Sequence, residues 1–337
     1  MPLFNHSTLS YAAQHLAQVR YLAQLMAQRV LLAVLLISTG FAYAEPNKNN
    51  RAGSSNVIRM NSSDWSPLIK RYQREVIKLL LDNTRAEYGN YRLIDGNRGL
   101  PPERMRQSVG LGADTHLGLL SINLLNDTNT DKNTPAPATK IQVPILNGIL
   151  GLRKLIIRSS DQERFKQIRS KKDFLAFTPG QGLSWPDIDV YKHANINVVT
   201  SLTYSHLTPM LQQGRFDYLP LSIIETDAAI SGVKRSRPKI TSANLHYIMY
   251  NAPVYMYVSN DHPILVKRIK KAINNVIASG ELEALFLARF SQFIDQISPD
   301  SAYVWVLDNP MVSVEENRIL TERNLKIYFN EKSTVIR

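Results

Sequence analysis

The sequence has 337 residues, of which 44% are hydrophobic and 20% charged, a composition typical of a globular protein with a substantial core. It contains no cysteine, which excludes disulfide bonds, thiol catalysis, thiolate metal sites and a lipid anchor on a processed N-terminal cysteine. The net charge of +12 could favour anionic ligands, but the cations are scattered rather than gathered with aromatic residues, so we expect a solvated basic surface and no nucleic-acid partner.

Residues 1–44 predict a secretory signal peptide. They contain two cations and no acidic residue, an apolar run from Val30 to Ile37, and an Ala-Tyr-Ala ending at 42–44. A cation, a short apolar core and a small-x-small ending are the signature of an export signal. The run is shorter than the roughly 20 residues of a bilayer-spanning helix, although an uncleaved anchor is the alternative. We therefore expect a soluble, periplasmic mature protein.

Further along the chain, apolar periodicity and turn residues predict alternating strands and helices. Strands are expected at 57–60, 91–94, 118–122, 152–157, 197–199, 216–221, 244–250 and 254–258. Helices are expected at 67–81, 102–109, 161–168, 171–175, 187–194, 207–213, 263–278 and 282–290. Strands that alternate with helices favour an α/β fold with largely parallel sheets.

Two stretches within residues 57–310 resemble the type II periplasmic solute-binding proteins of ABC transporters, close to the amino-acid-binding group. The first runs from Gly-Gln-Gly-Leu-Ser-Trp-Pro-Asp at 180–187, through a strand, to Gly-Arg-Phe-Asp at 214–217. The second is the strand at 253–259, similar to the strand that returns to the first lobe, with the helical stretch 263–290 behind it. The resemblance implies a two-lobed α/β fold with a hinge and a central cleft.

The resemblance also implies a domain organisation. Lobe one would comprise residues 56–158 and 253–310, lobe two would comprise residues 159–252, and residues 311–337 would form a C-terminal tail. The two crossings near Arg158 and Asn251 would act as the hinge. Ligand would bind in the cleft, and closure of the lobes would trap it.

Three residues are candidates for contacts with the ligand's charges or rings. The resemblance implies that Arg153 could clamp an anionic group through paired hydrogen bonds, although a surface cation is the alternative. Glu225 lies near the position of the family's amine-binding Asp, which is absent here, and could replace it. Trp65 follows the first strand and could line the cleft, or simply pack in the core.

The glycine-containing turn adds further candidates. Gly180, Gln181 and Ser184 would present backbone N–H groups at the start of a helix, which suits a carboxylate or phosphate, unless this is an ordinary turn. Trp185 could stack on a ligand or simply be packed. These residues, with the three above, make up the predicted ligand site.

No sequence motif indicates catalysis. There is no nucleophile elbow, phosphate-binding loop or His-Glu-x-x-His zinc motif, and His116, His193, His246 and His262 lack metal-ligand spacing. We expect no enzyme activity, cofactor or metal, while a dehydratase with Glu225 as its acid or base is a distant alternative. The leading hypothesis is a monomeric binding protein for a small polar or anionic metabolite that serves a permease or a sensor. The second is a binding-protein-like module that docks on a membrane sensor or envelope protein.

Overall fold

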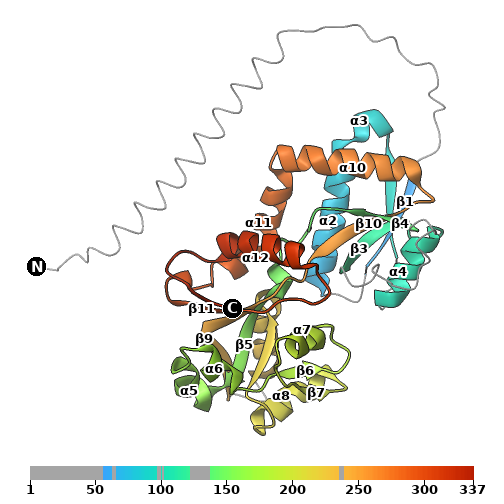
Figure 1. Ribbon diagram of the computed structural model, residues 1–337. Coiled ribbons are helices and arrows are strands. Elements are labelled where there is room, and N and C mark those ends of the chain that lie inside the picture. Colours follow the sequence, from blue (N-terminus) through green and yellow to red (C-terminus); the bar gives the residue numbers. More distant parts are fainter. Residues whose placement is uncertain (1–55, 63–65, 97–99, 101, 122–136, 235–238) are drawn as a thin grey trace, which may run out of the picture. The chain divides into compact units, whose positions relative to one another are not determined.

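The computed structural model describes residues 56–62, 66–96, 100, 102–121, 137–234 and 239–337. The predicted signal peptide at 1–44 and the candidate residue Trp65 lie outside these ranges. The described strands form two five-stranded sheets and a two-stranded sheet, each with helices packed against it (Figure 1). The predicted two-lobed α/β fold is confirmed, but both large sheets mix parallel and antiparallel strands, whereas the sequence predicted largely parallel ones.

The first sheet has the strand order β2-β1-β3-β10-β4. Its strands are β1 (Asn56–Asn61), β2 (Tyr91–Asp95), β3 (Leu117–Ser121), β4 (Ala138–Ile141) and β10 (Val254–Ser259). β1 runs parallel to β2 and β3, whereas β10 runs antiparallel to β3 and β4. The strand expected to return the chain to the first lobe therefore does so, between two strands that precede it by more than a hundred residues.

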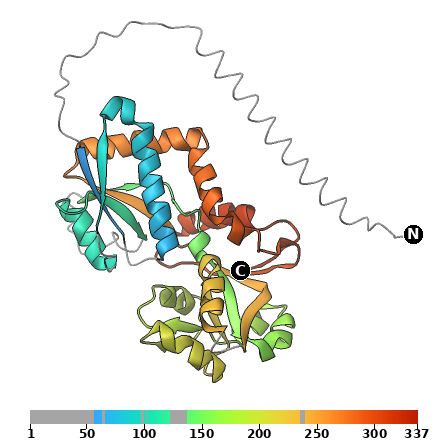
Figure 2. The same cartoon turned by 180° about the vertical axis from the view of Figure 1, so that it is seen from behind.

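Five helices accompany the first sheet. They are α2 (Pro67–Asn83), α3 (Arg85–Tyr88), α4 (Pro102–Leu111), α10 (Pro263–Ala278) and α11 (Glu281–Ile294). Helix α2 buries Ile69, Tyr72, Val76 and Leu80, whose spacing places them on one face. That face packs beside α10 in the largest core cluster (Figure 2). Gly280 ends the α10 segment with φ of 79°, a left-handed conformation that suits glycine.

The second sheet has the order β12-β11-β9-β5-β8. Its strands are β5 (Leu152–Arg158), β8 (Tyr218–Ser222), β9 (Ile240–Met249), β11 (Tyr303–Val306) and β12 (Thr334–Ile336), and the small sheet pairs β6 (Gly180–Gly182) with β7 (Val199–Ser201). The accompanying helices are α5 (Gln162–Lys166), α6 (Lys171–Leu175), α7 (Asp187–His193), α8 (Tyr204–Gln212) and α9 (Ile223–Lys234). Short 3₁₀ turns are η2 (Ile149–Gly151), η3 (Ser159–Asp161) and η4 (Pro299–Ser301).

Two strands within the residue ranges expected for lobe one belong to the second sheet. Strand β5, placed by prediction at the end of lobe one, pairs along its length with β8 and β9 of the second sheet. Strand β11 also falls in the range assigned to lobe one, yet it pairs with β9 and β12. The pairing partners are set by long-range backbone hydrogen bonds, which local sequence periodicity does not report.

The C-terminal segment 311–337 is an integral part of the fold rather than a simple tail. Helix α12 (Val314–Tyr328) packs Tyr328 into the main core cluster. The strand β12 then joins β11 at the edge of the second sheet. The last 27 residues therefore contribute to both of the large structural units.

A network of buried asparagines ties α12 to the strand ends. The Asn251 side chain donates to the Asn317 carbonyl at 2.9 Å and to the Thr321 hydroxyl at 2.9 Å. Asn317 donates to the Asn309 carbonyl at 2.8 Å, and Asn309 donates to the Asn251 carbonyl at 2.7 Å. Asn324 donates to the Asn251 side-chain oxygen at 3.2 Å. The network thus links the segments that follow β9 and β11 to one helix.

Within the described residues, none of the helices combines the length and the apolarity that crossing a bilayer would demand.

Candidate functional site

The predicted anion clamp, Arg153, is paired with a carboxylate of the chain itself. Arg153 is the second residue of β5, and its guanidinium donates to Asp187 Oδ1 at 2.6 Å. The Tyr250 hydroxyl donates to the same oxygen, and the guanidinium lies 5.2 Å from the centre of the Tyr250 ring. The Arg153 and Asp187 side chains are only 13% and 12% exposed. Asp187 therefore occupies the place where a ligand carboxylate was expected.

The neighbours of Arg153 stabilise its charged form. Burial by itself would lower the pKa of Arg153, but the charge of Asp187 and the neighbouring Tyr250 and Glu225 raise it above its ordinary value. A guanidinium is ionised at all physiological pH values in any case. The Arg153–Asp187 pair is therefore a permanent, largely buried ion pair.

The structure brings Glu225 to the same place. It lies in the first turn of α9, and its Oε2 is 4.0 Å from the guanidinium of Arg153. Its side chain is 42% exposed, far more than that of Asp187. Glu225 therefore adds a solvent-accessible negative charge beside a pair that is already neutral.

The glycine-containing segment differs from its prediction. Gly180, Gln181 and the following glycine form the strand β6, paired with β7, rather than a turn that opens a helix. A Cβ on Gly180 would lie 2.4 Å from the Phe216 ring, so the glycine permits close packing. Ser184 is exposed in the turn that follows, and α7 begins only at Asp187. The segment is therefore a strand followed by a turn, and an anion site on its backbone N–H groups stays a prediction.

Several buried polar atoms beside Arg153 have no hydrogen-bond partner. Among the described residues, five of the seven such atoms belong to one group: Arg153 Nε, both amide atoms of Gln181, and the hydroxyls of Tyr191 and Tyr218. Tyr191 and Gln181 interact, but not in hydrogen-bonding geometry. We refer to Arg153, Gln181, Asp187, Tyr191, Tyr218 and Tyr250 as the polar cluster.

The polar cluster combines the donors of Arg153 and the tyrosines with the acceptors of Asp187 and the Gln181 amide oxygen. Burial raises the pKa of Tyr191 above its ordinary value, and the charge of Asp187 raises it further. Burial likewise raises the pKa of Tyr218. Both hydroxyls therefore keep their protons at physiological pH. Buried polar groups in proteins are normally hydrogen-bonded, so the unpaired atoms of the polar cluster are an exception to that rule.

An exposed apolar edge adjoins the polar cluster. Trp185 and Tyr204 lie with ring centroids 6.2 Å apart at an angle of 36°. Leu183 and Leu202 are 54% and 85% exposed, and the Leu183 N–H donates to the carbonyl of Ser201, next to Leu202. Burial raises the pKa of Tyr204, and so does the charge of Glu225. We call Leu183, Trp185, Leu202 and Tyr204 the aromatic edge.

Two of the four histidines that were expected to be isolated, His116 and His262, lie in contact. His116 and His262 stack with ring centroids 3.8 Å apart and line a hollow of about 380 Å³ beside the start of α10. His246 is buried, where it bonds the Phe165 carbonyl at 2.6 Å and accepts from Trp305 Nε1 at 3.3 Å. No group of three or more ligating side chains suited to a metal ion occurs in the described ranges. His116, His246 and His262 pack with aromatic and backbone partners.

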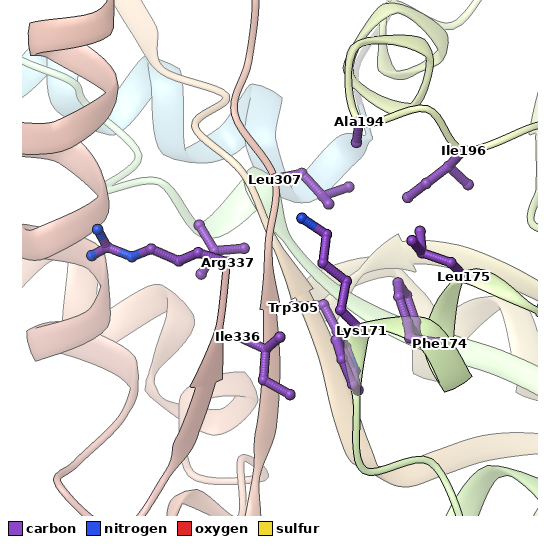
Figure 3. A pocket seen from close by; sticks show the side chains of 10 residues that line it. Lys171, Phe174, Leu175, Ala194, Ile196, Trp305, Leu307, Ile336 and Arg337 are labelled. Carbon is purple, nitrogen blue, oxygen red and sulfur yellow. The ribbon is translucent and has the colours of Figure 1, made fainter.

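Two other hollows lie apart from the polar cluster. One, of about 10 Å³, is lined by residues that include Lys171, Phe174, Trp305, Leu307 and Ile336 (Figure 3). It has room for about one water molecule. The other, of about 760 Å³, lies between α11 and α12. Its rim includes Ile277, Leu287 and Ile319, each close to half exposed. We call this second hollow the α11–α12 groove.

Sequence reasoning identified Arg153, Glu225 and Trp185 but missed their partners. Asp187 and Tyr191 are four residues apart on α7, a spacing that places both on one helix face. That spacing was visible in the sequence. Tyr250 and Tyr204 carried no local signal, because their positions depend on the pairing of distant strands.

Comparison with known proteins gives similarities of structure only. No protein-family model matches the sequence, and no curated protein matches it significantly. Among solved structures, a probable amino-acid ABC transporter extracellular-binding protein from Bacillus subtilis has 16% identity and a TM-score of 0.48, over 70% of this chain and 97% of that one. An ancestral arginine-binding protein bound to arginine has 14% identity and a TM-score of 0.43, over 70% and 98%.

A third similar structure is the second substrate-binding domain of GlnP from Lactococcus lactis, in an open conformation. It has 15% identity and a TM-score of 0.43, over 69% of this chain and 95% of that one. All three are described as binding proteins or domains. At these identities the similarity concerns the fold.

Proposed function

We propose that the protein is a periplasmic solute-binding protein that holds a small polar metabolite at the polar cluster. The observation that carries the proposal is the concentration of buried, unpaired donors and acceptors on Arg153, Gln181 and Tyr191. A buried polar atom without a partner costs about 1–3 kcal/mol. A solute that supplies the missing hydrogen bonds would therefore gain affinity from the unsatisfied state of the free protein.

The expected ligand was polar or anionic, and the polar cluster bears on that choice. Arg153 and the tyrosine hydroxyls are donors that suit ligand oxygen atoms. An anion, however, would compete with Asp187 for Arg153, and it would approach the exposed charge of Glu225. We therefore propose a polar solute rather than an anionic one.

The remaining features of the proposal come from the sequence. The cation, the apolar run and the Ala-Tyr-Ala ending in residues 1–44 support export to the periplasm. We propose that the protein acts as a monomer, that the solute lies between the two lobes, and that the loaded protein serves an inner-membrane permease or sensor.

Thermal unfolding in the presence of metabolites tests the function. The purified protein is screened against amino acids, amines, organic acids, sugars and phosphates. A ligand at 100 times its dissociation constant adds about 2.7 kcal/mol of stability, which shifts the midpoint by several degrees in a protein of this size. No shift with any compound, for a cooperatively unfolding protein, would contradict solute binding.

Two tyrosine variants test whether the solute binds at the polar cluster. Tyr191→Phe removes one unpaired buried hydroxyl and should weaken the best ligand while leaving the fold intact. Tyr303→Phe, on β11, is the matched control, because Tyr303 lies outside the polar cluster and should keep full affinity. Equal affinity of both variants would place the ligand elsewhere.

A second function, docking on a membrane sensor or envelope protein, is favoured by two observations. Asp187 already neutralises the charge of Arg153, and the α11–α12 groove exposes Ile277, Leu287 and Ile319. Photo-crosslinking in cells from position 319 would then give one defined adduct with an envelope protein. The 88% exposed Val314, at the start of the same helix, is the control position. Adducts of equal yield at both positions would contradict docking in the groove.

A further inference from the structure

The charge balance of the polar cluster disfavours a carboxylate ligand. Arg153 and Asp187 neutralise each other at 2.6 Å in a largely buried setting. A ligand carboxylate that took Arg153 would leave Asp187 buried without its counter-ion, which is strongly unfavourable. Tyr250 adds a second hydrogen bond to Asp187 and holds it in place. Arg153 is therefore not available as a free anion clamp.

The charge that does face solvent is negative. The Glu225 carboxylate is 42% exposed, and its contact with Arg153, at 4.0 Å, is longer than a hydrogen bond. The charges of Arg153 and Asp187 cancel each other. Arg153, Asp187 and Glu225 together therefore carry a net charge of −1. This carboxylate is the available electrostatic partner for a solute.

The aromatic edge reaches the Glu225 carboxylate through Tyr204, on which the charge of Glu225 acts. Tyr204 is 52% exposed, and the centroid of its ring lies 6.2 Å from that of the half-buried Trp185. Aromatic faces attract organic cations through the ring quadrupole, most strongly for Trp and Tyr. Leu183 and Leu202, both exposed, extend the same edge and offer contact to an apolar group.

We propose that this site selects an organic amine or quaternary ammonium ion that has an apolar body and no carboxylate. The cation is held by Glu225 and the rings of Trp185 and Tyr204, and the apolar body lies on Leu183 and Leu202. The inference rests on the proposed solute-binding function and names the class of solute. It departs from amino-acid binding, which requires both an amine site and a free anion clamp.

Calorimetric titration with matched compounds tests the inference. Agmatine is compared with arginine, tyramine with tyrosine, and choline with glycine betaine, because each pair differs by the presence of a carboxylate. We expect the member without a carboxylate to bind at least about ten times more tightly in one or more pairs, a difference of about 1.4 kcal/mol.

Variants assign the interaction to named residues. Glu225→Gln should weaken the amine about tenfold, and Tyr204→Leu should weaken it several-fold, consistent with cation–π energies of about 0.5–2 kcal/mol. Glu283→Gln is the matched control, because Glu283 is an exposed acid on α11 at the α11–α12 groove, and it should change nothing.

The outcomes separate the inference from the function on which it rests. If carboxylate-bearing members bind more tightly, or if only organic acids stabilise the protein, the inference is overturned and solute binding stands. If Glu225→Gln and Glu283→Gln have equal effects, the inference is also overturned. If no compound binds to the folded protein, both the inference and solute binding fail.

Discussion

Arg153 and Asp187 lie 34 residues apart in the chain and connect the start of β5 to the start of α7 through a hydrogen bond of 2.6 Å. Tyr250, just beyond the end of β9, donates to the same Asp187 oxygen. Strand β5, helix α7 and the segment after β9 therefore meet at one carboxylate. That carboxylate is the counter-ion of the largely buried Arg153.

Removing this counter-ion should destabilise the protein. Asp187→Ala leaves Arg153 buried without a carboxylate, and we expect the free energy of unfolding to fall by about 3–5 kcal/mol at pH 7. Asp189→Ala is the control, because Asp189 is exposed in the same helical turn and should cost less than about 0.5 kcal/mol. Urea denaturation followed by circular dichroism measures both. A similar small loss for the two variants would show that the pair contributes little.

The asparagine network should be a second point of sensitivity. Asn317→Ala leaves the carbonyls of Asn309 and Val312 without their side-chain donor, and we expect a loss of about 3 kcal/mol. Asn274, exposed on α10, is the control position, and Asn274→Ala should change stability by less than about 0.5 kcal/mol. Denaturation midpoints that coincide with wild type for Asn317→Ala would contradict the role of the network.

Two glycines should respond in opposite directions to the same substitution. Gly180→Ala places a methyl group 2.4 Å from the Phe216 ring, and we expect a loss of about 1–3 kcal/mol from overpacking. Gly232 lies in α9 with open space around it, so Gly232→Ala should raise stability by about 0.5–1 kcal/mol through helix propensity. Differential scanning calorimetry measures both, and a gain from Gly180→Ala would refute the packing argument.

Stability should fall in mild acid because of two buried histidines. Burial, with nearby positive charge, lowers the pKa of His116 to about 4, and burial lowers that of His246 to about 4. The unfolded chain binds protons with the ordinary pKa of about 6.5. The contribution of each is therefore complete above about pH 6.5 and is lost as the pH falls from there towards 4.

The slope is the measurable quantity. Each histidine adds at most about 1.4 kcal/mol per pH unit to the loss. Urea denaturation between pH 7.5 and 5 should show this decline before most carboxylates titrate. The exposed His206 serves as the control, and His206→Gln should keep the slope. Stability that is constant from pH 7.5 to 5 would contradict the neutral, buried state of both histidines.

The sequence predicted the fold where the signal is local. Helix α10 follows from its apolar spacing and its ending at Gly280, and β10 was recognised as the strand that returns to the first lobe. The sheet that β5 joins could not be predicted, because β5 looks like any buried strand and only its partners β8 and β9 assign it to the second sheet. Helix α12 and strand β12 were missed because the C-terminal segment was interpreted as a tail.

The sequence predicted that Arg153 and Glu225 lie close together, but not which side chains surround them. Arg153 and Glu225 were expected at one site, and they lie 4.0 Å apart. That Arg153 is already paired could not be inferred, because Asp187 reaches it through the packing of α7 on the second sheet. Gly180 and Gln181 were expected in a turn, but pairing with β7 makes them a strand.

Hydrogen exchange tests the central claim most directly. The compound that stabilises the protein most is added, and amide exchange is compared with that of the free protein. We expect slower exchange in residues 181–191, which carry part of the polar cluster and of the aromatic edge, in residues 200–206 of the aromatic edge, and in residues 222–228 around Glu225. Protection confined to α11 and α12, or no change in exchange despite saturation, would contradict solute binding at the polar cluster.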